Sequence, residues 1–199
     1  MAQRAVALGM SESIMRLRCR PDELPSDLYR IQYEGLVAAD TTKTYQSMEA
    51  FGTSVTLHFT WNYRGRSPFI SLFSDKSYAE NWGCKEPWLG AEATQEDNWC
   101  LCSIATDLLE DTVVFKLSRL VKHLGLELPE GAEKHIEGGY IYLHKIPHSA
   151  VVEQVMGNDI RNSQSSRSSR LRQFIAHLPI SERDITSEEL LRDLKALGL

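Results

Sequence analysis

The chain lacks the features that would place it in a membrane or on nucleic acid. No run of its 199 residues approaches the ~20 apolar residues that a membrane-spanning helix needs. Residues 1–10 are too short and too weakly apolar for a secretory signal. The net charge is −5, so general binding to phosphate backbones or anionic lipids is not expected. We therefore expect a cytoplasmic protein with no membrane partner; secretion by a non-classical route would leave no trace in these features.

Cysteine is scarce, and its spacing is poor for a metal site. Only four cysteines are present, Cys19, Cys84, Cys100 and Cys102. Structural zinc sites use pairs with about two to four residues between the ligands. Cys100 and Cys102 have one residue between them and lie in an apparent strand, where alternate residues share a face. We expect buried free thiols and no metal.

The commonest enzyme signatures are also missing. The sequence contains no Gly-x-Ser-x-Gly, P-loop or Gly-x-Gly-x-x-Gly motif, which argues against the usual hydrolase, NTPase and Rossmann sites. With 42% hydrophobic and 25% charged residues, the composition is that of a globular chain long enough for one large domain, or for one domain and an arm.

The patterns that are present predict an α+β order. Apolar alternation, short apolar runs and helical spacing, bounded by turn and capping residues, identify the elements. We predict strands at residues 28–33, 53–61, 68–73, 99–106, 138–147 and 171–178, and helices at residues 12–18, 75–82, 111–124 and 187–197.

Changes in composition divide the chain. Prolines close an N-terminal arm over residues 1–26. Residues 158–170 are rich in serine and arginine, and we predict that they form a mobile linker. The linker separates a main domain at residues 27–157 from a strand and helix at residues 171–199, which we expect to pack on the same domain.

Two polar residues on predicted strands are candidates for a binding site. Ser71 lies within a strand of bulky apolar residues, where a plain core would not use a polar residue. Arg30 lies on an alternating strand, and an inward-facing arginine needs an anion. The simpler alternatives are a core hydroxyl bonded to backbone for Ser71 and a salt-bridged surface residue for Arg30. His58 and Trp61 flank a predicted strand end and either line a pocket or form a packed rim.

This order of elements resembles the ADP-ribosyltransferase fold in its Arg-Ser-Glu class, over residues 27–150 and at most to residue 186. Leu28-Tyr29-Arg30 is similar to the strand that carries an NAD-contacting arginine. Phe69-Ile70-Ser71-Leu72-Phe73-Ser74 is similar to the Ser-Thr-Ser strand, with Leu72 and Phe73 replacing Thr and Ser. The resemblance implies a split mixed or antiparallel sheet with flanking helices, and it assigns NAD binding to Arg30, Ser71 and Phe73.

The third element of that class, a glutamate about seven residues before an Ile-Pro turn, is not matched. Counting back from Ile146 gives Gly139, with Glu137 two residues earlier, and counting back from Ile180 gives Gln173. The family uses this carboxylate to stabilise the positive charge that develops as nicotinamide leaves. Glu137 would serve if the chain bulged at its following glycines; otherwise the chain is a natural pseudoenzyme, or Gln173 is an engineered replacement of glutamate.

Two functions follow from the resemblance. The first is transfer of ADP-ribose from NAD to a protein or nucleic-acid acceptor, with Ser71 and either Glu137 or Gln173 as catalytic residues. The second is an inactive interaction module that binds a protein partner through its tails. A solvated surface acid is an equally simple interpretation of Glu137. A carboxylate within reach of a ligand between Arg30 and Ser71 would distinguish the two functions.

Overall fold

The computed structural model describes residues 9–33, 39–60, 65–85, 99–109, 113–129 and 131–177, with the backbone alone for residues 171–177. The chain forms two compact units, Met1–Met156 and Gly157–Leu199. The first unit carries the sheet and the candidate site, and the described part of the second is one helix. The α+β class expected from the sequence is confirmed.

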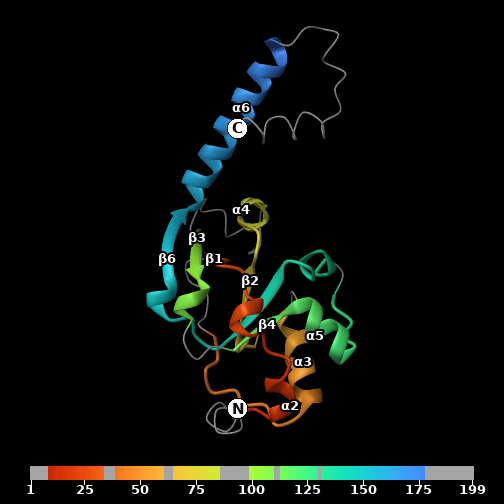
Figure 1. Cartoon of the computed structure of the whole chain (residues 1–199). Coiled ribbons are helices and arrows are strands. Elements are labelled where there is room, and N and C mark those ends of the chain that lie inside the picture. The colour runs from red at the N-terminus through yellow and green to blue at the C-terminus, as the bar shows by residue number, and fades with distance from the viewer. Residues whose placement is uncertain are drawn as a thin grey trace. The chain divides into compact units, whose positions relative to one another are not determined.

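A six-stranded sheet organises the first unit (Figure 1). Its strands lie in the order β4-β5-β2-β1-β3-β6, and every pair of neighbours runs antiparallel. The strands are β1 (Asp27–Tyr33), β2 (Phe69–Phe73), β3 (Trp99–Ala105), β4 (Val114–Lys116), β5 (Gly139–Leu143) and β6 (Val151–Met156).

Helices begin and end at recognisable caps. The Ser47 side chain accepts a hydrogen bond from the Ala50 amide at the start of α3, and Asp75 accepts one from Tyr78 at the start of α4. Gly125, with a φ of 59°, ends α5 in the left-handed conformation that glycine favours. The α-helices are α2 (Glu12–Met15), α3 (Met48–His58), α4 (Lys76–Cys84), α5 (Leu117–Leu124) and α6 (Gly157–His177), and the 3-10 turns are η1 (Pro21–Glu23), η2 (Thr106–Leu108), η3 (Glu133–His135) and η4 (His148–Ala150).

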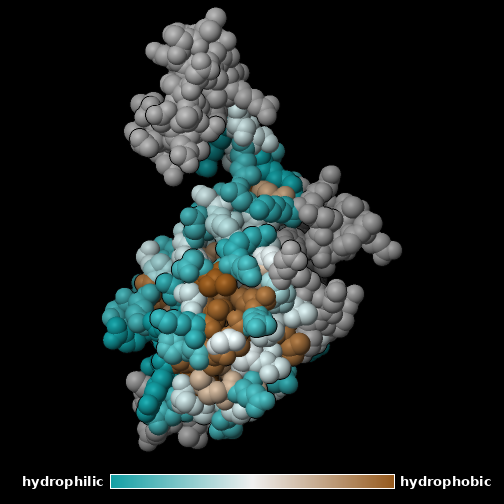
Figure 2. Space-filling view, turned by 90° about the vertical axis from the view of Figure 1, so that its right-hand side faces the viewer, coloured by the Kyte–Doolittle hydropathy of each residue, from teal (hydrophilic) through white to brown (hydrophobic). Residues whose placement is uncertain are grey.

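Two hydrophobic clusters divide the core, because alternate residues of β2 and β5 point to opposite faces of the sheet. Phe69 and Ile141 belong to the first core cluster, with the buried faces of α2, α3 and α5. Leu72 and Tyr140 belong to the second core cluster, with residues of β1 and β3. Figure 2 shows apolar side chains near the middle of one face, framed by polar ones.

The sheet is weakly joined at its centre. β1 pairs with β2 through a single residue pair, Tyr29 with Phe73, whereas β1 pairs with β3 along its whole length, from Asp27 to Tyr33. The two strands therefore diverge on one side of this pair. A cavity occupies this region.

Several predicted elements are confirmed. The strands at residues 28–33, 68–73, 99–106 and 138–147 correspond to β1, β2, β3 and β5. The helix predicted at residues 75–82 is α4, with Asp75 as its cap. In each case a clear apolar pattern coincided with a turn or cap at its end.

The strand predicted at residues 53–61 is wrong, because Met48–His58 form helix α3. Phe51 and Val55, four residues apart, are both fully buried, which is the spacing of one helical face. The single helix predicted over residues 111–124 is also corrected: Val114–Lys116 pair with β5 as strand β4, and the helix begins only at Leu117.

The linker predicted at residues 158–170 and the strand predicted at residues 171–178 are wrong. Gly157–His177 form the continuous helix α6. No glycine or proline follows Gly157 within this segment, so nothing in the backbone interrupts the helix. The helix predicted at residues 187–197 lies outside the described residues.

Residues near the N-terminus contribute to the core, although we expected an arm there. Ile14 and Met15 of α2 are 0% and 1% exposed and belong to the first core cluster. The edge strand β6 was not predicted from the sequence, because its central residues are polar and exposed. None of the described helices is long and apolar enough to cross a membrane.

Candidate functional site

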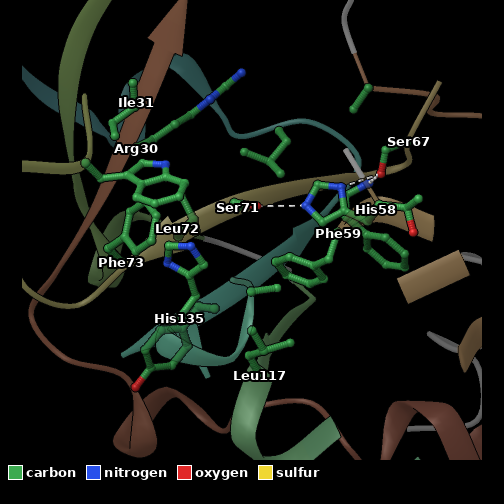
Figure 3. A pocket seen from close by; sticks show the side chains of 18 of the residues that line it. Arg30, Ile31, His58, Phe59, Ser67, Ser71, Leu72, Phe73, Leu117 and His135 are labelled. Atoms are coloured by element: carbon green, nitrogen blue, oxygen red, sulfur yellow. Dashed lines mark hydrogen bonds between the residues drawn. The ribbon is translucent and has the colours of Figure 1, made fainter. Parts of the chain in front are cut away.

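A cavity of about 430 Å³ lies where β1 and β2 diverge (Figure 3). Its walls come from β1, β2, α3, α4, η3 and the starts of α5 and β5. This volume is within the range of about 300–1,000 Å³ typical of small-molecule sites. Apolar side chains form most of the wall, and a few polar groups interrupt it.

The three residues assigned to NAD binding all border this cavity. Ser71 and Phe73 come from β2, and Arg30 comes from β1. Because Tyr29 pairs with Phe73, regular alternation would place Arg30 and Ser71 on opposite faces of a continuous sheet. The separation of the two strands lets both residues line the same space.

Arg30 is a half-buried cation at the edge of the cavity. None of the ion pairs between described residues involves it. Burial lowers the pKa of its guanidinium from the usual value, which indicates that the protein pays a desolvation cost for this charge. An anionic ligand would offset that cost.

His58 links two serines along the cavity wall. Its Nδ1 lies 2.7 Å from Ser67 Oγ and its Nε2 lies 2.8 Å from Ser71 Oγ (Figure 3). Ser67 Oγ also accepts a hydrogen bond from the Phe69 amide, and in the tautomer of His58 that is protonated on Nε2 the Ser67 proton is donated to Nδ1. In that tautomer His58 donates through Nε2 to Ser71, whose hydroxyl proton can then be donated to a ligand.

The contact between Ser71 and His58 has the length of a nucleophile–base pair, but its electrostatics are unsuitable. Burial lowers the pKa of His58 to about 4, and no carboxylate of a described residue contacts its Nδ1 to stabilise an imidazolium. A base with so low a pKa accepts a proton poorly at neutral pH. We therefore interpret Ser71 as a hydrogen-bond donor to a ligand.

His135 forms the other polar group of the cavity, and sequence reasoning missed it. It is only 6% exposed, and its ring lies 4.2 Å from that of Trp82, measured between centroids. Nδ1 lies 2.8 Å from the Tyr78 hydroxyl, whereas the buried Nε2 has no hydrogen-bond partner among the described residues. If the phenol donates to Nδ1, Nε2 carries a proton that lacks an acceptor among the described residues.

No aspartate or glutamate is among the described residues that line the cavity. Glu137 is exposed and does not line it, and the pairing of β5 with β2 continues regularly to Gly139, so no bulge turns Glu137 inward. A Cβ atom at Gly139 would overlap the carbonyl oxygen of His135.

Gln173 lies on helix α6 in the second unit. Trp61 lies outside the described residues.

Metal binding has no support in the described part of the chain. No group of three or more His, Cys, Asp or Glu side chains there is arranged to hold an ion. Cys100 and Cys102 are free thiols whose sulfur atoms lie 3.8 Å apart on one face of β3.

An α+β domain with a small-molecule-sized cavity at a split in its sheet is the class that this geometry defines. The chain belongs to the family described as a domain of unknown function, DUF7587, which matches residues 26–160. That range includes all six strands and every described residue of the cavity wall. No curated protein and no solved structure matches the chain.

The two buried histidines predict a loss of stability in mild acid. Burial is the main cause that lowers the pKa of His58 and of His135 from 6.5 to about 4, so both stay neutral in the fold while the unfolded chain takes up protons below pH 6.5. The free energy of unfolding should therefore fall by about 1.4 kcal/mol per pH unit for each histidine between pH 6.5 and 4. Urea denaturation at pH 7, 6 and 5 measures this slope, and His58→Gln should reduce it. Equal stability at pH 7 and 5 would contradict the assignment.

Proposed function

We propose that this domain is an ADP-ribosyltransferase-like module that binds NAD-type nucleotides without efficiently transferring ADP-ribose. The observation that carries the proposal is the composition of the cavity wall. Arg30, Ser71 and Phe73 border one cavity, and no described carboxylate lines it. The residues that the resemblance assigns to ligand binding are together, whereas no carboxylate among the described lining residues takes the place of the catalytic acid.

The binding half of the proposal rests on three complementary groups. Arg30 has no ion-pair partner among the described residues and would pair with the pyrophosphate of a dinucleotide. Ser71 has a hydroxyl proton to donate in the tautomer in which His58 Nε2 donates to its oxygen. The Phe73 ring offers an apolar surface for a planar group.

The inference that ADP-ribose is not transferred rests on the charge of the groups in the cavity wall. When the bond to nicotinamide breaks, positive charge develops on the ribose, and a preorganised carboxylate is the group that would stabilise it. His58 and His135 are neutral and cannot supply this negative charge. The active-enzyme alternative requires Glu137 to leave the surface and enter the cavity, against the regular pairing of β5.

Binding and nicotinamide release by the full chain test the two halves separately. We expect NAD to bind and nicotinamide release to stay at the level of the Glu137→Gln variant. Release that Glu137→Gln abolishes would establish the enzyme instead. A gain of about 100-fold in Gln173→Glu would identify position 173 as the catalytic one, since a single preorganised electrostatic contact contributes about 10²–10³.

Arg30→Ala should weaken NAD binding by about 1.5–3 kcal/mol, the usual effect of losing a charge-assisted hydrogen bond. Isothermal titration calorimetry measures the change. Arg16→Ala is the matched control, because it removes the same charge from the exposed residue that follows the last turn of α2. Equal affinity in Arg30→Ala and Arg16→Ala would remove Arg30 from the site.

A further inference from the structure

The end of the cavity formed by His135 and Trp82 is electropositive. The ammonium nitrogens of Lys134 and Lys85 lie 5.1 and 6.0 Å from the centroid of the Trp82 ring. After burial, the charges of these two lysines are the further causes that lower the pKa of His135. The positive charges of the two lysines therefore raise the electrostatic potential where the His135 imidazole borders the cavity.

Nothing described in the cavity wall balances this positive potential. Its described lining contains no carboxylate, and its one fully charged group is Arg30. The π face of Trp82 is a favourable place for a cation, but the two lysine side chains already use it. A second cation brought to this end would meet like charge, with no carboxylate in the described lining to balance it.

When the Tyr78 hydroxyl donates to Nδ1 of His135, the same end presents a hydrogen-bond donor. Tyr78 holds His135 through Nδ1, which leaves Nε2 buried and without a partner among the described residues. A buried polar group without a partner is costly, so a ligand that supplies an acceptor here gains affinity. Carbonyl, hydroxyl and phosphate oxygens are suitable acceptors.

We propose that the His135–Trp82 end selects against the cationic pyridinium ring of oxidised NAD and accepts a neutral or anionic group that carries a hydrogen-bond acceptor. The proposal rests on nucleotide binding in this cavity, as put forward above. It predicts that the domain binds two ligands more tightly than NAD. One is NADH, whose nicotinamide ring is uncharged, and the other is ADP-ribose, which has no nicotinamide ring. The domain would thus prefer NADH and ADP-ribose to oxidised NAD, which is the substrate of an ADP-ribosyltransferase.

The pair NAD and NADH tests the charge directly, because the two ligands are almost identical in size. Calorimetric titration of the full chain should give affinities for NADH and for ADP-ribose about fivefold or more above that for NAD, the ratio expected from partly screened charges. Lys134→Glu should raise the affinity for NAD relative to NADH. Lys122→Glu, at an exposed position of α5, makes the same change in net charge and should leave the ratio unchanged.

His135→Phe tests the donor while keeping an aromatic ring beside Trp82. It should weaken NADH binding by about five- to tenfold, as loss of one hydrogen bond does, and ADP-ribose binding less. A thermal melt confirms that the variant is folded. An equal loss for both ligands would overturn the placement of the ring at His135.

The outcomes separate the two proposals. Equal or tighter binding of NAD than of NADH, with Arg30→Ala weakening both, would overturn the charge selection and leave nucleotide binding intact. Absence of binding by NAD, NADH and ADP-ribose alike would overturn nucleotide binding and the selection that depends on it.

Discussion

Gly139→Glu should lower the free energy of unfolding by about 3 kcal/mol or more and should not produce a transferase. This substitution places a glutamate where the resemblance expects the catalytic acid. A Cβ atom at this position would overlap the carbonyl oxygen of His135, and its next neighbour is a methyl group of Leu117 at 3.2 Å. The overlap is with backbone, which cannot rotate away as a flexible side chain can.

Chemical denaturation and nicotinamide release measure the two parts of this expectation. Gly138→Ala is the matched control, because a Cβ there meets only Ser74 Oγ, at an ordinary contact distance of 3.5 Å. A Gly139→Glu chain that is as stable as the parent and releases nicotinamide would show that the carboxylate alone was missing.

Phe51→Ala should cost about 3–5 kcal/mol of stability, the usual range for truncating a buried phenylalanine. Phe51 is fully buried on α3, and its ring lies 5.7 Å from Phe69 and 5.1 Å from Phe115, measured between centroids. Removing the ring leaves a void between the helix and the sheet. Because Phe69 also lines the cavity, ligand binding should weaken together with stability.

Urea denaturation measures the loss. Glu49→Ala, an exposed change on the same helix, should alter the free energy of unfolding by less than about 0.5 kcal/mol. A loss below about 1 kcal/mol in Phe51→Ala would mean that the neighbouring rings close over the void.

Where a local pattern coincided with its own cap or turn, the sequence predicted the fold well. The strand over Phe69–Phe73 and the helix that begins after Asp75 are examples. The prediction for the segment around Val55 was wrong because its β-branched residues alternate with others as in a strand. The residues that indicate a helix, the Ser47 cap and Phe51, lie earlier in the chain. Tertiary burial of one helical face outweighed the local β propensity.

The candidate site was predicted only in part. The resemblance identified Arg30, Ser71 and Phe73, which border one cavity. His135 ends a short turn of charged residues, and no pattern in the sequence marks it as a site residue. Its place in the site comes from burial beside Trp82 and from contact with Tyr78, which is 57 residues away in the chain. No pattern in the sequence indicates that position 139 excludes a side chain, since the obstacle is the carbonyl of a neighbouring part of the backbone.

The single residue pair between β1 and β2 has a consequence for cooperativity. β4, β5 and β2 form one half of the sheet, β1, β3 and β6 form the other, and Tyr29 with Phe73 is the only pairing between them among the described strands. Backbone hydrogen bonds therefore join the halves at one point, and the side chains of the second core cluster, which come from both halves, also couple them. A ligand that contacts Arg30 on one half and Ser71 on the other would strengthen this coupling and make the sheet unfold more cooperatively.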